Sequence, residues 1–217
     1  MAVTYLHGKG SIRALWARLF QWRVPGLLYG VALLAPLAAM SLALLITYFV
    51  HPDAFALGDI NVVKLAVIFF ILPLLDGPIG EEIGWRGFFL PLLMQRHNAI
   101  VASLIVAVVW FLWHLPHYHA DGMEMSGLIL AKYIIYTFAL SLIHTWLFTR
   151  AQGSILIHVI FHNMANYVVL LAFTLFPAVA TVALAETAYT VAMVIVAALA
   201  GLSLWRQARP KEALAIY

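Results

Sequence analysis

Residues 27–50 read LLYGVALLAPLAAMSLALLITYFV and contain no charged side chain. This run is longer than the roughly 20 residues that an α-helix needs to cross the hydrocarbon of a bilayer. In lipid, a continuous apolar run forms a helix, because only helices and closed barrels satisfy every backbone hydrogen bond there. The run is also much longer than the apolar part of a signal peptide. We therefore predict a membrane-spanning helix at residues 27–50.

The composition extends this prediction to the whole chain. Its 217 residues are 65% hydrophobic and 10% charged, with a mean hydropathy of +0.99, whereas soluble domains are roughly 45–50% apolar and 25% charged. The chain has no cysteine, which excludes disulfides, thiolate metal sites and a cysteine nucleophile. Its net charge of +3 comes from few acids and from Lys and Arg near the ends of apolar segments, a pattern typical of membrane proteins. No nucleic-acid partner is expected.

Further apolar segments follow, separated by short polar stretches. Helices are expected at residues 60–75, 78–94, 99–113, 127–148, 154–176 and 178–205. The sequence therefore predicts an all-α, polytopic transmembrane bundle of about six to eight helices, in which residues 26–217 form a single transmembrane domain. We expect an integral, multi-pass protein of a prokaryotic cell membrane, in contact with the lipid bilayer.

Residues 1–25 differ from the rest in mixing basic and aromatic side chains. Arg13, Arg18 and Arg23 alternate with Trp16, Phe20 and Trp22. Such a mixture suits a helix that lies in the headgroup layer, with aromatic rings toward the acyl chains and arginines toward the headgroups. We interpret this segment as an interfacial anchor.

Polar residues inside the apolar segments are candidates for function, because a charged side chain in hydrocarbon costs about 2.5–3.5 kcal/mol on insertion scales. They fall in three motifs: GEEIGWRGFFLPLL at residues 80–93, WFLWHLPH at residues 110–117 and HVIFHNMAN at residues 158–166. In the first motif, Glu82 and Arg86 are four residues apart on a helix and can pair. Glu81 is turned about 100° away and lacks that partner.

The other two motifs also place polar residues on common helix faces. Trp110 and His114 are four residues apart, so the indole can pack beneath the imidazole. His158, His162 and Asn166 follow one another at intervals of four and share one face. The chain thus offers a glutamate, histidines and an amide in otherwise apolar helices.

One glutamate, two histidines and an amide are sufficient to hydrolyse a bond without a covalent intermediate. The glutamate, assisted by a histidine, takes a proton from water as general base. The second histidine and the amide donate hydrogen bonds to the developing oxyanion, which is most effective where water is scarce. The signatures HExxH and GxSxG are absent, so neither the common zinc-hydrolase motif nor a serine nucleophile elbow is present. No cofactor is expected, although Glu81, His114 and His162 could hold a zinc ion as a minority alternative.

Each candidate also has a structural interpretation. A negative charge such as Glu81 suits a helix N-terminus, and His114 is close enough to a span end to be interfacial. His162 and Asn166 could be hydrogen-bond donors between helices. For some residues the structural interpretation is favoured: a buried pair that orients its helix for Glu82 and Arg86, a satisfied core histidine for His144, and a packing acid for Glu186.

Together the three motifs resemble those of the CPBP family of intramembrane proteases, which includes the type II CAAX prenyl endopeptidases and bacteriocin-processing or immunity relatives. The pattern of that family is EExxxR, then FxxxH, then HxxxN or HxxxD. Glu81, Glu82 and Arg86 match the first motif, and His162 and Asn166 match the third. The middle motif departs from the pattern, because Trp110 stands where phenylalanine is usual before His114. The resemblance covers about residues 76–169.

The resemblance implies a bundle with a membrane-embedded polar cavity and an intramembrane endopeptidase acting on a membrane-associated peptide or protein. It implies that Glu81 activates water with help from His114, and that His162 and Asn166 stabilise the oxyanion. Glu82, Arg86 and Trp110 would support these residues. Because the family also contains immunity and scaffolding proteins, a non-catalytic membrane protein that uses the same polar cluster structurally is the alternative. A transporter is a weaker alternative, because the sequence shows no inverted repeat.

The charge pattern and the proposed site make conflicting demands on topology. If residues 78–94 do not cross the membrane, the lysines and arginines at the segment ends fall on one side, as the positive-inside rule requires. Glu81 and His114, however, reach the same level only if residues 78–94 and 99–113 form an antiparallel hairpin that enters the membrane. We favour the hairpin, at the expense of the charge pattern downstream.

Overall fold

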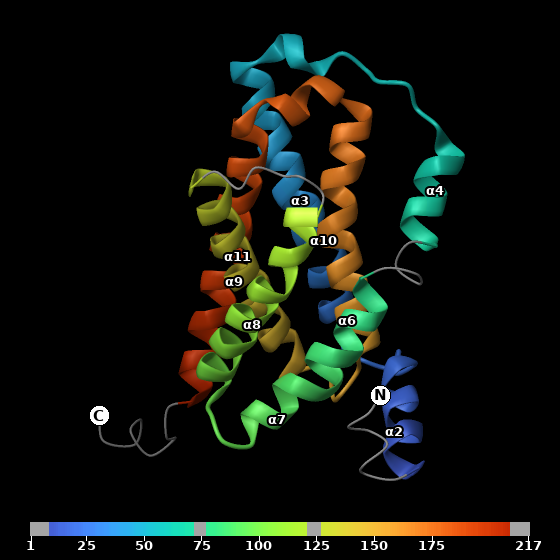
Figure 1. Ribbon diagram of the computed structural model, residues 1–217, viewed down its shortest axis with the longest axis vertical. Coiled ribbons are helices and arrows are strands. Elements are labelled where there is room, and N and C mark those ends of the chain that lie inside the picture. Colours follow the sequence, from blue (N-terminus) through green and yellow to red (C-terminus); the bar gives the residue numbers. More distant parts are fainter. Residues whose placement is uncertain (1–8, 72–76, 121–126, 209–217) are drawn as a thin grey trace.

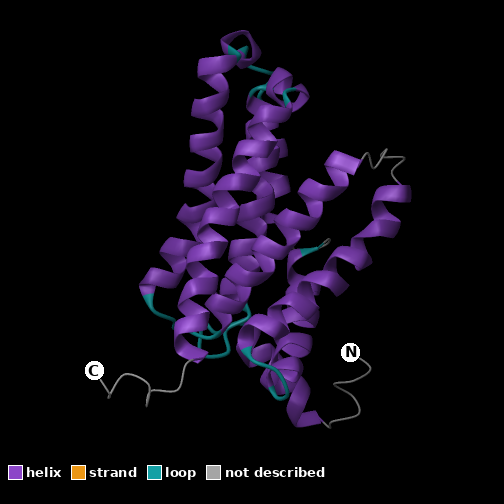
Figure 2. Ribbon diagram, turned by 90° about the vertical axis from the view of Figure 1, so that its left-hand side faces the viewer, coloured by secondary structure: helices purple, strands orange, loops and turns teal. Residues whose placement is uncertain are grey.

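The computed structural model describes residues 9–71, 77–120 and 127–208, and all regular structure within them is helical (Figures 1 and 2). Five helices are long and apolar enough to cross a membrane. They are α3 (Gly26–Val50), α8 (Ala99–Ala120), α9 (Gly127–Phe148), α10 (Leu156–Leu175) and α11 (Ala183–Ala208). The predicted all-α, multi-pass membrane fold is therefore confirmed.

Small residues bring the long helices close together. α3 packs against α10 and α11, and α9 packs against α8 and α11. On α3 the buried face carries Ala32, Ala39 and Ala43, each at most 5% exposed. Small side chains let helix backbones approach one another, which is the main source of packing energy where lipid is as apolar as the side chains. The short helices η1 (Pro52–Phe55) and η3 (Pro177–Thr181) contact each other where α3 ends and α11 begins.

The second predicted span, residues 60–75, is described only as far as residue 71. Helix α4 (Val62–Phe70) has nine residues, and at about 1.5 Å per residue it covers less than half of the roughly 30 Å of hydrocarbon. Residues 72–76, at the end of the predicted span, lie outside the described part of the chain. α4 lies against α10, where Asn163 Nδ2 donates to the carbonyl of Phe69 at 3.2 Å.

The segment at residues 78–94 is a broken helix. It consists of α6 (Pro78–Gly84), a π-helical turn η2 (Trp85–Phe89) and α7 (Leu90–Met94). The turn coincides with the residues before Pro91, which has no N–H and so cannot bond to the carbonyls of Arg86 and Gly87. π-helical turns of this kind are frequent at functional sites, and this one directly follows the two glutamates.

The N-terminal helix α2 (Lys9–Leu19) supplies the missing donors. Arg18 donates from its two terminal nitrogens to the carbonyls of Gly87 at 2.8 Å and Arg86 at 3.0 Å, and from Nε to that of Gly153 at 2.8 Å. Burial lowers the pKa of the Arg18 guanidinium. Arg18 therefore ties α2 to the broken helix and to the α9–α10 loop. The interfacial position of α2 itself remains a prediction.

The broken helix also removes the conflict between charge pattern and site. In Figure 1, α4 lies above α6, and α7 lies at the lower end beside the start of α8, so that α4 and α6–α7 together descend through the depth of the bundle. The lower end also holds α2, the α9–α10 loop and the end of α11. The described basic residues at segment ends belong to these parts, among them Arg96, Arg150 and Arg206. The hairpin and the charge pattern are compatible because the second crossing is shared by two short elements.

Candidate active site

A cavity of about 440 Å³ lies between α6, α8, α9, α10 and α11. Its wall includes all four residues that the sequence marks as candidates for chemistry: Glu81, His114, His162 and Asn166. They come from three helices, Glu81 from α6, His114 from α8, and the other two from successive turns of α10. The remaining polar lining is contributed mainly by α9 and α11, through Lys132, Tyr133, Tyr136, Thr137, Glu186, Tyr189 and Thr190.

One oxygen of the Glu81 carboxylate is held and the other faces His114. Trp110 Nε1 donates to Glu81 Oε2 at 2.6 Å, and Trp85 Nε1 lies 3.4 Å from the same oxygen. Oε1 lies 4.0 Å from His114 Nε2, which is too far for a direct hydrogen bond. The side chain of Glu81 is 9% exposed. The carboxylate is thus anchored on one side and open on the other.

The backbone fixes which nitrogen of His114 carries a proton. His114 Nδ1 lies 2.9 Å from the carbonyl oxygen of Trp110, and a carbonyl can only accept. Nδ1 therefore holds the hydrogen in a neutral ring, which leaves Nε2 as the basic nitrogen facing Glu81. The predicted packing of the Trp110 indole against this ring is present, with ring centroids 6.1 Å apart and the ring planes tilted by 52°. A water molecule with hydrogen bonds of about 2.8 Å can donate to Glu81 Oε1 and His114 Nε2 together.

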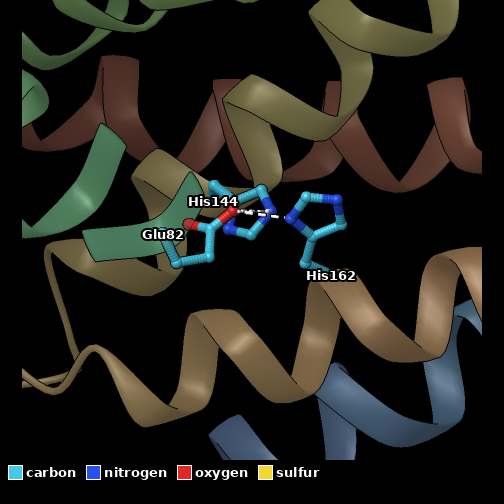
Figure 3. A group of neighbouring side chains, drawn as sticks. All are labelled: Glu82, His144 and His162. Carbon is cyan, nitrogen blue, oxygen red and sulfur yellow. Dashed lines mark hydrogen bonds and ion pairs between the residues drawn. The ribbon is translucent and has the colours of Figure 1, made fainter. Parts of the chain in front are cut away.

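The second glutamate is fully buried and is the acceptor of a cluster behind the cavity (Figure 3). The predicted pair with Arg86 is present, with Arg86 Nη1 at 2.9 and 3.1 Å from the two Glu82 oxygens. His162 Nδ1 lies 2.8 Å from Glu82 Oε1 and, facing a carboxylate, acts as the donor. The other edge of the His162 ring is therefore available to the cavity. A carboxylate in this relation to an imidazole fixes its orientation and its tautomer.

Trp110 connects the two glutamate clusters. Its side chain is 3% exposed, and the Arg86 guanidinium carbon lies 4.5 Å from its ring centre, the geometry of a cation–π contact. Its ring centroid is 5.4 Å from that of His162. Phenylalanine, which the resemblance leads one to expect here, would fill similar space but has no N–H for Glu81.

Sequence reasoning missed two histidines of this cluster. His144 on α9 and His158 on α10 are both 0% exposed, and their Nδ1 atoms are 3.1 Å apart. His144 Nε2 lies 3.7 Å from Glu82 Oε1. The spacing of four between His158 and His162 indicated a shared face, and His144 lies within an apolar run, where ionisable residues are rare and functional. What the sequence could not indicate is that α9 and α10 bring the two rings together.

Glu82, His144 and His162 each offer a ligand atom, and these atoms lie within 4.8 Å of one another. By distance alone this group could hold a metal ion, and it differs from the minority set of Glu81, His114 and His162. Its charges fit a dication poorly, because Arg86 already donates to both carboxylate oxygens and neutralises them. The 2.8 Å contact between Glu82 and His162 is also a hydrogen bond. The residues fit a hydrogen-bonded cluster better than a zinc site.

A second hollow of about 440 Å³ lies on the other side of Glu81. Gly77, Gly80 and Gly84 form part of its wall, and the rest is aromatic: Trp85, Phe88, Phe89 and Trp113. A Cβ atom at Gly80 or Gly84 would meet nothing within 4 Å. Glu81 therefore lies between a polar cavity and an apolar groove.

Comparison with known proteins assigns the part of the chain that contains all three motifs. Residues 63–168 match the model of the type II CAAX prenyl endopeptidase Rce1-like family. This segment is similar to the Rce1-like family. The resemblance predicted from the motifs is thereby confirmed. The Rce1-like segment runs from α4 through α10, and it contains every residue of the cluster around Glu81 and Glu82.

A curated relative supports the same assignment. CAAX prenyl protease 2 of Methanococcus maripaludis is 28% identical over 92 residues, which are 40% of this chain and 34% of the relative. The chain thus covers about a third of the length of that relative. The name of that relative denotes a prenyl protease, and the likeness covers 92 residues.

Proposed function

We propose that the protein is an intramembrane endopeptidase that hydrolyses a peptide bond of a membrane-associated substrate. The observation that carries the proposal is the 4.0 Å separation of Glu81 Oε1 and His114 Nε2 at the wall of the cavity. Because Trp110 occupies the other oxygen of Glu81 and the other nitrogen of His114, the two free atoms are both acceptors. Water between them donates both hydrogens and turns its lone pairs outward, as attack on a carbonyl requires.

In the reaction, the water oxygen bonds to the carbonyl carbon while Glu81 takes one proton as general base. The carbonyl oxygen gains the negative charge, and two groups donate hydrogen bonds to it: the amide of Asn166, and His162 from Nε2 when both of its ring nitrogens carry hydrogen. The proton held by Glu81 then passes to the leaving nitrogen as the carbon–nitrogen bond breaks. The carboxylate is regenerated, and neither a covalent intermediate nor a metal ion is needed.

The rival interpretation is a non-catalytic membrane protein in which these polar groups hold helices together. It accounts well for Glu82 and Arg86, which are buried and paired. It accounts less well for Glu81, His114 and Asn166, which line an open cavity on three different helices. A structural role would pair these side chains with neighbouring helices and leave no space between them, so the cavity favours hydrolysis.

The test uses the purified full chain in liposomes with a fluorogenic membrane peptide. Glu81→Gln and His114→Ala should each lower kcat by roughly 10²- to 10⁴-fold as losses of base catalysis. His162→Ala and Asn166→Ala should each lower it by roughly 10²- to 10³-fold as losses of oxyanion donors. His97→Ala, at an exposed position in the turn between α7 and α8, is the matched control and should leave the rate unchanged. Full activity in the Glu81 and His114 variants would overturn the proposal.

Absence of product with any panel of membrane peptides, combined with a lowered melting temperature in the four variants, would favour the non-catalytic alternative, in which these side chains hold helices together. The metal-free mechanism is tested separately by dialysis against a chelator followed by elemental analysis. Activity should survive with no stoichiometric metal present. Loss of activity that zinc restores would instead assign a catalytic role to a bound ion.

A further inference from the structure

The buried histidine pair behind the candidate active site has no part in the mechanism described above. His144 and His158 are fully buried in the bundle, on α9 and α10, and their rings lie 5.3 Å apart. Burying two polar rings among apolar helices is costly unless their nitrogens find partners. Apart from each other, the nearest polar partner given by the structure is Glu82 Oε1, 3.7 Å from His144 Nε2. Figure 3 shows the rings of His144 and His162 and the carboxylate of Glu82 converging from α9, α10 and α6.

The contact between the two Nδ1 atoms limits where the protons can be. At 3.1 Å it is a hydrogen bond only if one nitrogen carries the hydrogen and the other accepts it. If His144 were the donor, its neutral ring would turn a bare lone pair of Nε2 toward the Glu82 carboxylate, and the two would repel. If His158 is the donor, His144 accepts at Nδ1 and carries its own hydrogen on Nε2, directed at Glu82. The second arrangement satisfies both contacts.

In this arrangement the Nε2–H of His144 points at Oε1 of Glu82. Glu82 Oε1 receives Arg86 Nη1 at 2.9 Å and His162 Nδ1 at 2.8 Å, and faces the N–H of His144 as a third, longer contact. Two hydrogen bonds and the electrostatic attraction of the His144 N–H at 3.7 Å hold the carboxylate, and through it the ring of His162. Removing the third donor would let the carboxylate turn toward Arg86 and release the imidazole.

We propose that His144 is a positioning residue for the candidate oxyanion site: it accepts a hydrogen bond from His158 at Nδ1, directs its Nε2–H at Glu82 and so holds His162 toward the cavity. The inference rests on the function proposed above for His162. His144 does not itself touch the cavity, so its effect on the reaction is indirect. Its chemistry resembles that of outer hydrogen-bond partners that orient imidazoles, whose loss typically costs 10- to 100-fold in activity.

Two substitutions at one position separate positioning from packing. His144→Leu keeps a branched side chain in the core but has no donor, whereas His144→Gln keeps an N–H that reaches toward Glu82. His144→Leu should lower kcat roughly tenfold with KM unchanged, since the substrate is bound elsewhere in the cavity. His144→Gln should stay within about threefold of the wild type, because an amide replaces the ring as donor. Equal kcat in both variants and the wild type, or equal losses in both, would overturn the inference.

A second measurement does not depend on activity. Histidine labelled with ¹⁵N in the full chain reports which ring nitrogen carries the proton, and single variants of His144, His158 and His162 assign the signals. The expected result is a proton on Nε2 of His144 and on Nδ1 of His158. The ¹⁵N signal of His162 should shift in the His144→Leu variant and stay at its wild-type position in the His144→Gln variant. A proton on Nδ1 of His144, or a His162 signal indifferent to both variants, would refute the inference.

The rate measurements and the ¹⁵N-histidine measurement test the role of His144 separately from the proposed function. If the wild type hydrolyses no peptide, the proposed function fails, while the labelled histidines still decide whether His144 donates to Glu82 and orients His162. If Glu81→Gln is inactive and His144→Leu is fully active, the proposed function stands and the positioning role is wrong.

Discussion

The indole nitrogen of Trp110 donates to Glu81 Oε2 at 2.6 Å, across the interface between α8 and α6. The backbone carbonyl of the same residue receives Nδ1 of His114 at 2.9 Å. One tryptophan therefore sets both the orientation of the carboxylate and the tautomer of the histidine that faces it. Because this position departs from the phenylalanine of the resembling family, it gives the chain a hydrogen bond that phenylalanine cannot make.

Replacing Trp110 with Phe should lower kcat without unfolding the protein. A hydrogen bond to a charged group contributes about 1.5–3 kcal/mol, which corresponds to roughly a 10- to 100-fold loss of rate if it is needed to hold the carboxylate. Initial-rate kinetics in liposomes measure the effect, and Trp16→Phe on the exposed face of α2 is the matched control. An unchanged kcat in Trp110→Phe would show that the indole only packs.

The glycine wall beside Glu81 should govern access of apolar groups to the site. A Cβ at Gly80 meets nothing within 4 Å, so Gly80→Leu should fold normally while filling the apolar groove. We expect KM for peptides with a large apolar residue near the cleaved bond to rise about tenfold, the scale of discrimination by an apolar pocket. Gly201→Leu on α11 also enters open space but borders neither hollow, and its KM should not change. A rise in both variants would point to a general effect on the bundle.

Arg18 should stabilise the broken helix rather than bind headgroups. Its hydrogen bonds reach two carbonyls that Pro91 leaves without a donor and a third in the α9–α10 loop. Arg18→Ala should lose about 2–3 kcal/mol of stability, seen as a fall in Tm of several degrees in detergent, since 1 kcal/mol shifts a protein of this size by roughly 2–4 °C. The exposed Arg13→Ala is the control. Melting curves in which the two variants coincide would contradict this role.

If α4 and α6–α7 together make the second crossing of the membrane, introduced cysteines at certain positions should be labelled from the same side. Since the chain has no cysteine, single cysteines can be introduced on an empty background at the exposed positions His97, Gln207 and Asp53. His97→Cys and Gln207→Cys should react together from the cytoplasmic side, where basic residues gather, and Asp53→Cys from the opposite side. Labelling of His97 and Asp53 from one side would mean that α4 and α6–α7 do not complete a crossing.

The sequence by itself determined the membrane fold, because apolar runs of this length have no other way to satisfy their backbone in lipid. It also determined the four candidate residues, since polar groups inside such runs are too costly to be accidental. The spacing of Glu82 and Arg86 was enough to predict their pairing, which depends only on the repeat of a single helix.

The tertiary structure decided everything that depends on neighbours from another helix. Pro91 leaves the carbonyls of Arg86 and Gly87 without a helical donor, and Arg18, from a helix about 70 residues earlier, donates to both. Glu81 meets Trp110 and not a cation, and Glu82 meets His162 and His144. Hydropathy and periodicity describe one helix at a time, whereas the tautomers and charges of this site are set by contacts between helices.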